Sequence, residues 1–391
     1  MSFGTLALIV LAGLGGPLLG LAGKRFVPVV VGEIIAGILV GPAVLGAVNP
    51  SGATISLLGE VGFAMLMLTV GMHLPLRDRR LAASLRSGAL LAGLVCVLAL
   101  PAGVLAAAVA GTGHAAVYAV VLASGSAAVL LPAFEELGLE GVSAMTVMAQ
   151  VTLADIITIL SVPIVLQPGR VGHVALGALL VAGAAVALLL LARAMAGAEW
   201  IHRVRHLSKR RHWALDLRIS LLVLFLLSWI AVKGGTSVLI AGFGAGLMVA
   251  VIGGPKRLST QVRGVAEGFF IPLYFVVLGA RLDLAGLVRD PAMLALAASL
   301  AALNVAIHLL AALALRRSVP VALAATAQLG VPAAVASLGL SEHLLSPVVA
   351  TAIVASALVS LTVCTLGIEM LVRAAPAVAP APEAVGAKPA A

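Results

Sequence analysis

Long uninterrupted apolar stretches dominate the chain, and short segments rich in charge, proline and glycine separate them. A helix crosses the hydrocarbon core of a bilayer with about 20 mostly apolar residues. Strands are not expected, because a lipid-exposed barrel needs alternating polar and apolar positions. The fold class is therefore an all-α polytopic membrane protein. The pattern predicts thirteen spans, near 4–22, 28–47, 55–74, 87–110, 114–134, 142–166, 172–195, 214–232, 235–253, 264–281, 292–315, 319–340 and 346–372.

The composition supports a membrane protein and argues against other classes. Of the 391 residues, 62% are apolar and only 10% are charged, whereas about a quarter of the residues in a soluble domain are charged. The two cysteines, Cys96 and Cys364, lie inside apolar runs and cannot build a disulfide framework. No metalloprotease or P-loop motif occurs in the sequence. Neither an enzyme activity nor a cofactor is therefore expected.

The basic residues predict the orientation of the chain in the membrane. With thirteen spans and the N-terminus outside, 20 of the 24 Lys and Arg residues fall in cytoplasmic segments. Only Arg170, Lys233, Arg281 and Arg289 fall on the outer side. This asymmetry is the positive-inside pattern of membrane proteins. It explains the net charge of +9 without a nucleic-acid partner, and it predicts a multi-pass inner-membrane protein with a cytoplasmic C-terminus.

Two segments outside the spans have a distinctive composition. The basic loop 196–213 contains His202, His206 and His212, and we expect it to be a solvated cytoplasmic loop. The alternative for this loop is contact with anionic lipid or a metal site at the three histidines. The Ala- and Pro-rich segment 374–391 is expected to be a disordered cytoplasmic tail.

Two of the predicted spans resemble one another. Segment 122–139 reads LASGSAAVLLPAFEELGL and segment 323–340 reads LAATAQLGVPAAVASLGL, with Pro132 and Pro332 two hundred residues apart. These segments are spans five and twelve, so they would cross the membrane in opposite directions. Inverted repeats of this kind are typical of secondary transporters.

The same two segments predict helices that are interrupted within the membrane. A helix can break there only where its freed backbone groups face protein or a water-lined cavity. An ordinary proline-kinked helix is the alternative. The small, hydroxylated and helix-breaking residues are Ser124, Gly125, Ser126 and Pro132 in the first segment and Thr326, Gln328, Gly330 and Pro332 in the second.

Asp155 is the acidic residue nearest the centre of an uninterrupted apolar span. A charge there costs roughly 2.5–3.5 kcal/mol on insertion scales unless it is paired, hydrated or neutralised. Thr152 and Thr158, three residues to either side, would lie on the same helical face. A carboxylate in this setting can hold either a proton or a cation, as a proton-coupled cation carrier requires. The alternative is a structural aspartate paired to a neighbouring helix.

Two further ionisable residues lie within the spans. His308, in span eleven, could pair with Asp155, titrate alone, or be a neutral histidine bonded within the bundle. Glu33 lies about a turn inside span two. It could pair with a cytoplasmic arginine, but orienting span two is the interpretation we favour.

Several sequence segments resemble the cation:proton antiporter superfamily, in its branch of bacterial sodium/proton antiporters and Kef-type potassium efflux proteins. The most specific is VVGEIIAGILVGPAVLG at residues 30–46, which is close to the GEilaGillGPs.LG pattern of that branch. Agreement continues in order through 63–74, 124–139, the Asp155 span and 269–284. Within the first motif, Glu33, Gly37, Gly41 and Pro42 fall on the pattern and are assigned a structural role.

The resemblance implies a fold and a transport mechanism. It implies a core of two inverted units with crossed, interrupted helices, roughly 87–166 and 292–373, and a scaffold and dimerisation domain from 1–74 and 172–281. Transport would proceed by elevator-like alternating access in a homodimer. Gly16 and Gly20 in the first span have a spacing that suits close helix packing.

The resemblance also assigns roles to individual residues. Asp155 matches the aspartate that binds the ion and the proton. Ser124, Gly125 and Ser126 match the polar break of the first crossing helix, and Gln328 and Gly330 match the second break.

The chain departs from the family pattern in several positions. Ala154 occupies the position before the aspartate, where family members usually have Asn, Asp or Gln, and His308 occupies a position where they usually have Lys or Arg. Leu329 and Val331 occupy positions that are often Arg and Glu. The resulting site has a single carboxylate, so one-for-one exchange is the simplest expectation.

Three functions are consistent with the sequence. The leading hypothesis is a secondary antiporter that exchanges Na⁺ or K⁺ for protons across the bilayer. A channel-like K⁺ efflux pathway on the same scaffold is the second, although no TVGYG-like filter occurs in the sequence. The third is a membrane scaffold or sensor that has lost transport, which the changes at Ala154, His308 and Val331 would favour.

Overall fold

The computed structural model describes residues 2–22, 29–72, 79–139, 141–195, 203, 207–208, 210–211, 213–253 and 256–374. Ala374 ends the last helix, and the rest of the predicted tail, 375–391, lies outside these described residues. The three histidines of the basic loop also lie outside them, as do Lys24, Arg25 and Arg77. Among the residues that are described, no group of His, Cys, Asp and Glu side chains could hold a metal ion.

Every regular element of the described residues is a helix, as the apolar pattern predicts. The bounds are α1 Phe3–Gly13, α2 Gly15–Ala22, α3 Val29–Val40, α4 Ala53–Met72, α5 Arg79–Ala110, α6 Ala115–Ala123, α7 Ala127–Glu136, α8 Val142–Leu166, η1 Pro168–Arg170, α9 Val171–Met195, α11 Leu215–Lys233, α12 Val238–Ile252, α13 Lys256–Val265, η2 Ala266–Phe270, α14 Ile271–Arg281, α15 Leu284–Arg289, α16 Pro291–Ala314, α17 Val319–Ala324, α18 Gly330–Ser341 and α19 Pro347–Ala374.

Nine helical stretches within the described ranges are long and apolar enough to cross a membrane, and shorter apolar helices accompany them. Each of the thirteen predicted spans contains helix in the structure. The ends differ most in three places. The second span is helical only to Val40 and then turns, and the fourth begins early, at Arg79. The tenth also begins early, at Lys256, as a continuous run of α13, η2 and α14.

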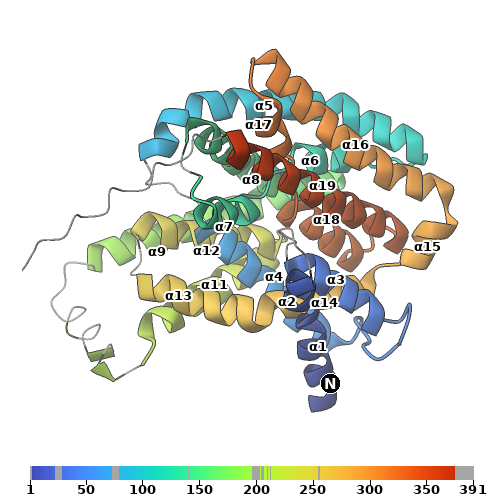
Figure 1. Ribbon diagram of the computed structural model, residues 1–391. Helices are drawn as coiled ribbons and strands as arrows, with labels where there is room; N and C mark the ends of the chain where they lie inside the picture. The colour runs from blue at the N-terminus through green and yellow to red at the C-terminus, as the bar shows by residue number, and fades with distance from the viewer. Residues whose placement is uncertain are drawn as a thin grey trace, which may run out of the picture.

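The helices pack into two groups (Figure 1). One group contains α5–α8 and α16–α19, with α5 lying against α6, α8 and α16. The other contains α1–α4, α9 and α11–α14, with α4 lying against α12 and α3 against α14. The groups meet mainly where α4, α12 and α14 contact α7, α8 and α18. Figure 1 draws the first group in the upper half and the second in the lower half.

The motif glycines of the second span allow α3 to pack closely against α14. A Cβ added to Gly41 would lie 2.7 Å from the Cα of Ala280. Gly37 faces the backbone of Val276 in the same way. Gly16 packs within the chain as well, because a Cβ there would meet Val29 and Glu33 of α3. These glycines therefore bring neighbouring helices of one chain together.

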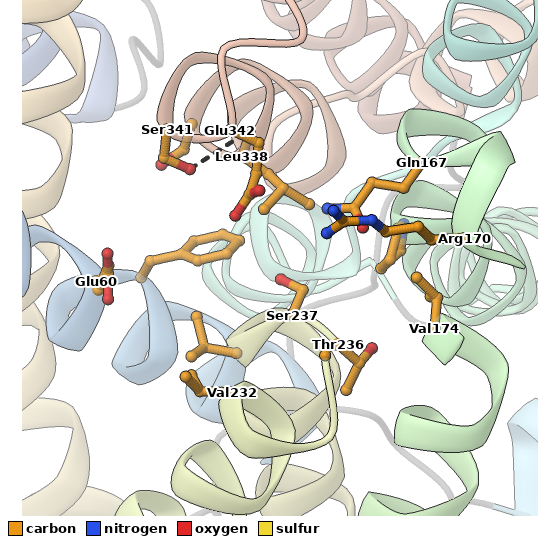
Figure 2. Close-up of a pocket in the computed structure, with 15 residues that line it drawn as sticks. Glu60, Gln167, Arg170, Val174, Val232, Thr236, Ser237, Leu338, Ser341 and Glu342 are labelled. Atoms are coloured by element: carbon orange, nitrogen blue, oxygen red, sulfur yellow. Dashed lines mark hydrogen bonds between the residues drawn. The ribbon is translucent and has the colours of Figure 1, made fainter. Parts of the chain in front are cut away.

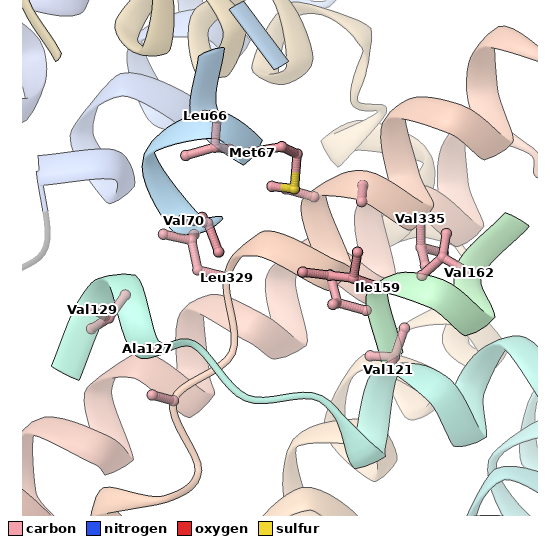
Figure 3. Close-up of a cluster of buried hydrophobic side chains, with 14 of the residues drawn as sticks. Leu66, Met67, Val70, Val121, Ala127, Val129, Ile159, Val162, Leu329 and Val335 are labelled. Atoms are coloured by element: carbon pink, nitrogen blue, oxygen red, sulfur yellow. The ribbon is translucent and has the colours of Figure 1, made fainter. Parts of the chain in front are cut away.

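Both repeat segments are interrupted, as their serine, glycine and proline content predicts. The first stops at Ala123 and resumes at Ala127, and the second stops at Ala324 and resumes at Gly330. The two breaks lie beside one another, because the Gln328 amide reaches the carbonyl oxygen of Val121 at 2.8 Å. Figure 3 shows the two non-helical segments crossing.

Candidate ion-binding site

The first break is built from three residues with weak helix preference. The hydroxyl of Ser124 donates to the carbonyl oxygen of Val121 at 2.7 Å, and the backbone N–H of Ser124 donates to the same carbonyl, so Ser124 caps the end of α6. Gly125 approaches α8 so closely that an added Cβ would lie 2.6 Å from Cγ1 of Val151. Ser126 is extended and makes no side-chain cap on α7. The free backbone N–H groups at the start of α7 therefore need an acceptor from another residue.

Asp155 provides that acceptor. The backbone N–H of Ala127, the first residue of α7, donates to Oδ2 of Asp155 at 2.9 Å. Asp155 lies near the middle of α8 and is 2% exposed. The N-terminus of a helix carries free N–H groups and a partial positive charge that favour an anion. The break therefore places the carboxylate at the positive end of a half-helix, inside the bundle.

The two threonines beside Asp155 differ in their contacts. The Thr158 hydroxyl donates to the carbonyl oxygen of Ala154 at 2.7 Å, so it is bonded within its own helix. The Thr152 hydroxyl is buried and has no hydrogen-bond partner. Thr152 therefore keeps a free oxygen close to the aspartate, whereas Thr158 does not.

The second break is held by amide side chains. Gln328 donates through Nε2 to the Val121 carbonyl at 2.8 Å and to Oδ1 of Asn304 at 3.0 Å. Asn304, on α16, donates in turn to the carbonyl oxygen of Thr326 at 3.0 Å and to Oγ of Ser360 at 2.9 Å. Gly330 begins α18 beyond this network. Gln328 thus connects the two breaks.

His308 lies one turn after Asn304 and is 3% exposed. Its Nδ1 bonds to the carbonyl oxygen of Asn304 at 2.8 Å, and because a carbonyl only accepts, this nitrogen carries the proton. Within the described residues no hydrogen bond or ion pair joins His308 to Asp155. Of the three alternatives for His308, the histidine bonded within the bundle matches this geometry.

A cavity of about 280 Å³ opens between the two groups of helices (Figure 2). Glu60 and Phe63 of α4 line it from one group, and Pro163 of α8 and Leu338 of α18 line it from the other. Glu342 lies at its edge and also borders a neighbouring cavity of about 1170 Å³. Both cavities lie where α18 ends, and the first also lies at the end of α8, which is the outer side under the predicted orientation.

An apolar layer separates this cavity from the aspartate. Along α8, Pro163 lines the cavity and Asp155 lies eight residues earlier, about 12 Å deeper at 1.5 Å per residue. The buried side chains of Ile159 and Val162 lie between these two levels on α8. Figure 3 shows them with Leu66, Met67 and Val70 of α4 and with Leu329 and Val335 beside the second break. The layer explains why Asp155 is closed off from the outer cavity.

A sequence profile of the family described as "Sodium/hydrogen exchanger, transmembrane" matches residues 6–374, nearly the whole chain. The chain belongs to this exchanger family. It is therefore a multi-pass membrane protein of a family that exchanges a monovalent cation for protons.

Individual relatives of the exchanger agree with the family match. The probable Na⁺/H⁺ antiporter GerT of Bacillus cereus is 23% identical over 263 residues, which cover 66% of this chain and 69% of GerT. The Na⁺/H⁺-K⁺ antiporter GerN of the same organism is 22% identical over 270 residues, 66% of this chain and 67% of GerN. The solved sodium proton antiporter MjNhaP1 of Methanocaldococcus jannaschii is similar in fold, with a TM-score of 0.62, 18% identity and coverage of 95% of this chain and 97% of that chain.

Two further polar residues are buried within the exchanger, Glu33 of the first motif and Asn304. Glu33 is buried on α3 at 3% exposure, and its Oε2 has no hydrogen-bond partner. It lies in the other group of helices from Asp155. Asn304 was not predicted to matter, although a lone amide in the middle of the apolar span 292–315 is a signal that could have revealed it.

Proposed function

We propose that the exchanger moves Na⁺ or K⁺ in one direction and protons in the other by alternating access, with Asp155 as the group that holds either ion. The observation that carries this proposal is the bond from Ala127 to the buried Asp155 carboxylate. Among the described residues, no basic side chain forms an ion pair with this carboxylate. It therefore needs a bound proton or cation to be neutral in the bilayer. The relative named as an Na⁺/H⁺-K⁺ antiporter supports K⁺ as a second candidate cation.

The neighbouring oxygen atoms suggest how a cation would be held. Alkali cations take oxygen ligands, and Thr152 offers a buried hydroxyl without a partner. Thr158 is committed to the Ala154 carbonyl. The ligand set that we infer is therefore the Asp155 carboxylate, the Thr152 hydroxyl and backbone oxygens of the first break, with Thr158 shaping α8.

The experiment that tests this function is proton flux in proteoliposomes with an imposed pH gradient. Na⁺, K⁺ and Li⁺ are added in turn, and the external pH is varied. At least one cation should collapse the gradient. If none does so at any pH, the antiporter function is wrong and the scaffold hypothesis leads.

A single carboxyl group also sets the stoichiometry that we propose. Asp155 is neutral with a proton and neutral with a monovalent cation, so neither half of the cycle moves net charge. Exchange should therefore be one for one and insensitive to membrane potential. Competition for one site should also raise the apparent KM for the cation as pH falls, approaching about tenfold per pH unit. In Na⁺-driven assays, valinomycin and K⁺ can be used to set the membrane potential. An electrical current that accompanies exchange under these conditions would contradict this stoichiometry.

The two groups of helices suggest which parts move. We infer that α5–α8 and α16–α19 form the core, and that α1–α4, α9 and α11–α14 form the scaffold. The sparse contacts between the groups and the cavity between them support this division. Sliding of the core would replace the outer cavity by one on the other side, carrying Asp155 across the apolar layer.

Tyr274 gives a way to test this motion. Its buried hydroxyl, on α14, donates to the carbonyl oxygen of Ala333 on α18 at 2.9 Å, and its ring stacks on Phe63 at 5.2 Å between centroids. Tyr274→Phe keeps the stacking and removes the hydrogen bond, which contributes about 0.5–1.5 kcal/mol. If the core moves, the variant should change the exchange rate at saturating cation by roughly two- to tenfold. An unchanged rate would show that this contact does not break during transport.

Orientation and assembly belong to the same proposal. The distribution of Lys and Arg supports an outer N-terminus and a cytoplasmic C-terminus in the inner membrane. A homodimer formed through the scaffold is proposed from the family resemblance. Gly16 does not support it, because this glycine packs against α3 of its own chain.

A further inference from the structure

Asn304 makes three side-chain hydrogen bonds beside the crossing of the two breaks. It is fully buried, at 0% exposure, in the middle of α16. Its amide donates to the Thr326 carbonyl and to Oγ of Ser360, and its Oδ1 accepts from Gln328. Both N–H donors and the carbonyl oxygen are therefore used, which is how a buried amide avoids a desolvation penalty.

The bonds of Asn304 reach both breaks, which are about two hundred residues apart in sequence. In the second break it holds the Thr326 carbonyl directly. It reaches the first break through Gln328, whose Nε2 donates to the Val121 carbonyl at the end of α6. The chain of bonds continues through Ser360, which donates to the Ser356 carbonyl of α19 at 2.9 Å. Asn304 thus joins α16 to the second break and to α19, and it reaches α6 through Gln328.

The first break is also what presents the Ala127 N–H to Asp155. Only three residues separate α6 from α7, so the position of the last turn of α6 restricts where α7 begins. A contact that fixes the Val121 end of α6 therefore also helps to fix the position of the Ala127 N–H at the ion site.

We propose that Asn304 is a positioning residue for exchange, which holds the two breaks in register through Gln328 and so sets the geometry at Asp155. This inference rests on the proposed antiporter function. It assigns no direct contact between Asn304 and the transported ion.

The test compares Asn304→Leu, Gln328→Met and the double variant with wild type in proteoliposomes. Both single substitutions keep the side-chain size and cut the same link from opposite ends. Each should raise the apparent KM for the cation about tenfold, as loss of one to two satisfied buried hydrogen bonds would, with a smaller change in kcat. The double variant should be no worse than the worse single variant, because both remove one shared interaction. Ser299→Ala is the matched control on α16, since its hydroxyl bonds only the Leu296 carbonyl.

A second measurement tests the positioning role of Asn304 independently of transport activity. Hydrogen–deuterium exchange of peptides covering 121–127 and 325–331 should increase in Asn304→Leu at both breaks, and Ser299→Ala should match wild type. A rise confined to 325–331, an unchanged KM, or additive effects in the double variant would each overturn the positioning role. If wild type itself shows no cation-driven flux, the proposed function fails, and the exchange pattern still decides whether Asn304 joins the breaks.

Discussion

Asp155→Asn should abolish cation-driven proton flux while leaving the protein folded. The substitution keeps the size of the side chain, and the amide oxygen can still accept the Ala127 N–H. What it removes is the ionisable oxygen pair, so the site can no longer exchange a proton for a cation. We expect the initial rate in proteoliposomes to fall to that of empty vesicles for Na⁺, K⁺ and Li⁺ alike. Residual exchange above one tenth of wild type would show that another group carries the ion.

Asp290→Asn is the matched control for this prediction. Asp290 is also an aspartate before a helix, and its carboxylate accepts the N–H of Ala292 at 2.9 Å at the start of α16. Asparagine caps helices about as well as aspartate, so this variant should fold and transport like wild type. Loss of activity in both variants would point to a general effect of removing acidic charge.

Gly125→Ala should impair exchange nearly as strongly, by a steric route. A Cβ at this position would lie 2.6 Å from Cγ1 of Val151 and 3.1 Å from its backbone oxygen. The backbone oxygen cannot move away without shifting α8, which carries Asp155, and Cγ1 can move only if Val151 leaves the χ1 rotamer that valine prefers in a helix. Overpacking of this kind costs about 1–3 kcal/mol, and a displacement of about 1 Å at a reacting site can cost roughly 100-fold in rate. We expect a drop of at least about tenfold in the exchange rate.

Gly330→Ala tests whether that loss is specific. Gly330 begins the half-helix of the second break, but an added Cβ would meet only the terminal methyl of Met67, at 3.6 Å. Methionine side chains adapt readily, so this variant should lose much less activity than Gly125→Ala. Initial rates of the two variants, normalised to the amount of reconstituted protein, make the comparison. Equal losses would mean that glycine flexibility, rather than contact with Val151, matters at the breaks.

The sequence predicts best those site residues whose type is energetically costly inside an apolar helix. Asp155 is recognisable because a carboxylate in an apolar span is costly unless it has a function. The breaks are recognisable because Ser, Gly and Pro cluster where a helix should continue. Their limits are less predictable, since the second break lies at 325–329 and ends three residues before Pro332.

Other features depend on tertiary contacts that local sequence does not contain. Thr152 and Thr158 are equally spaced from Asp155, and only the structure shows that Thr158 bonds back to Ala154. His308 is ionisable and so attracts attention, whereas Asn304, four residues earlier, forms the connecting bonds. Glu33 is similar: the motif identifies it, but its burial without a hydrogen-bond partner follows from the packing of α2 against α3.

The central claim is that one carboxyl, Asp155, holds either a proton or a cation. Proton release on cation binding tests it most directly, measured with a pH indicator on purified protein in weakly buffered detergent solution. Wild type should release about one proton for each cation bound, because a cation can occupy the carboxylate only after the proton leaves. Asp155→Asn should release none. Undiminished proton release from Asp155→Asn would contradict the account.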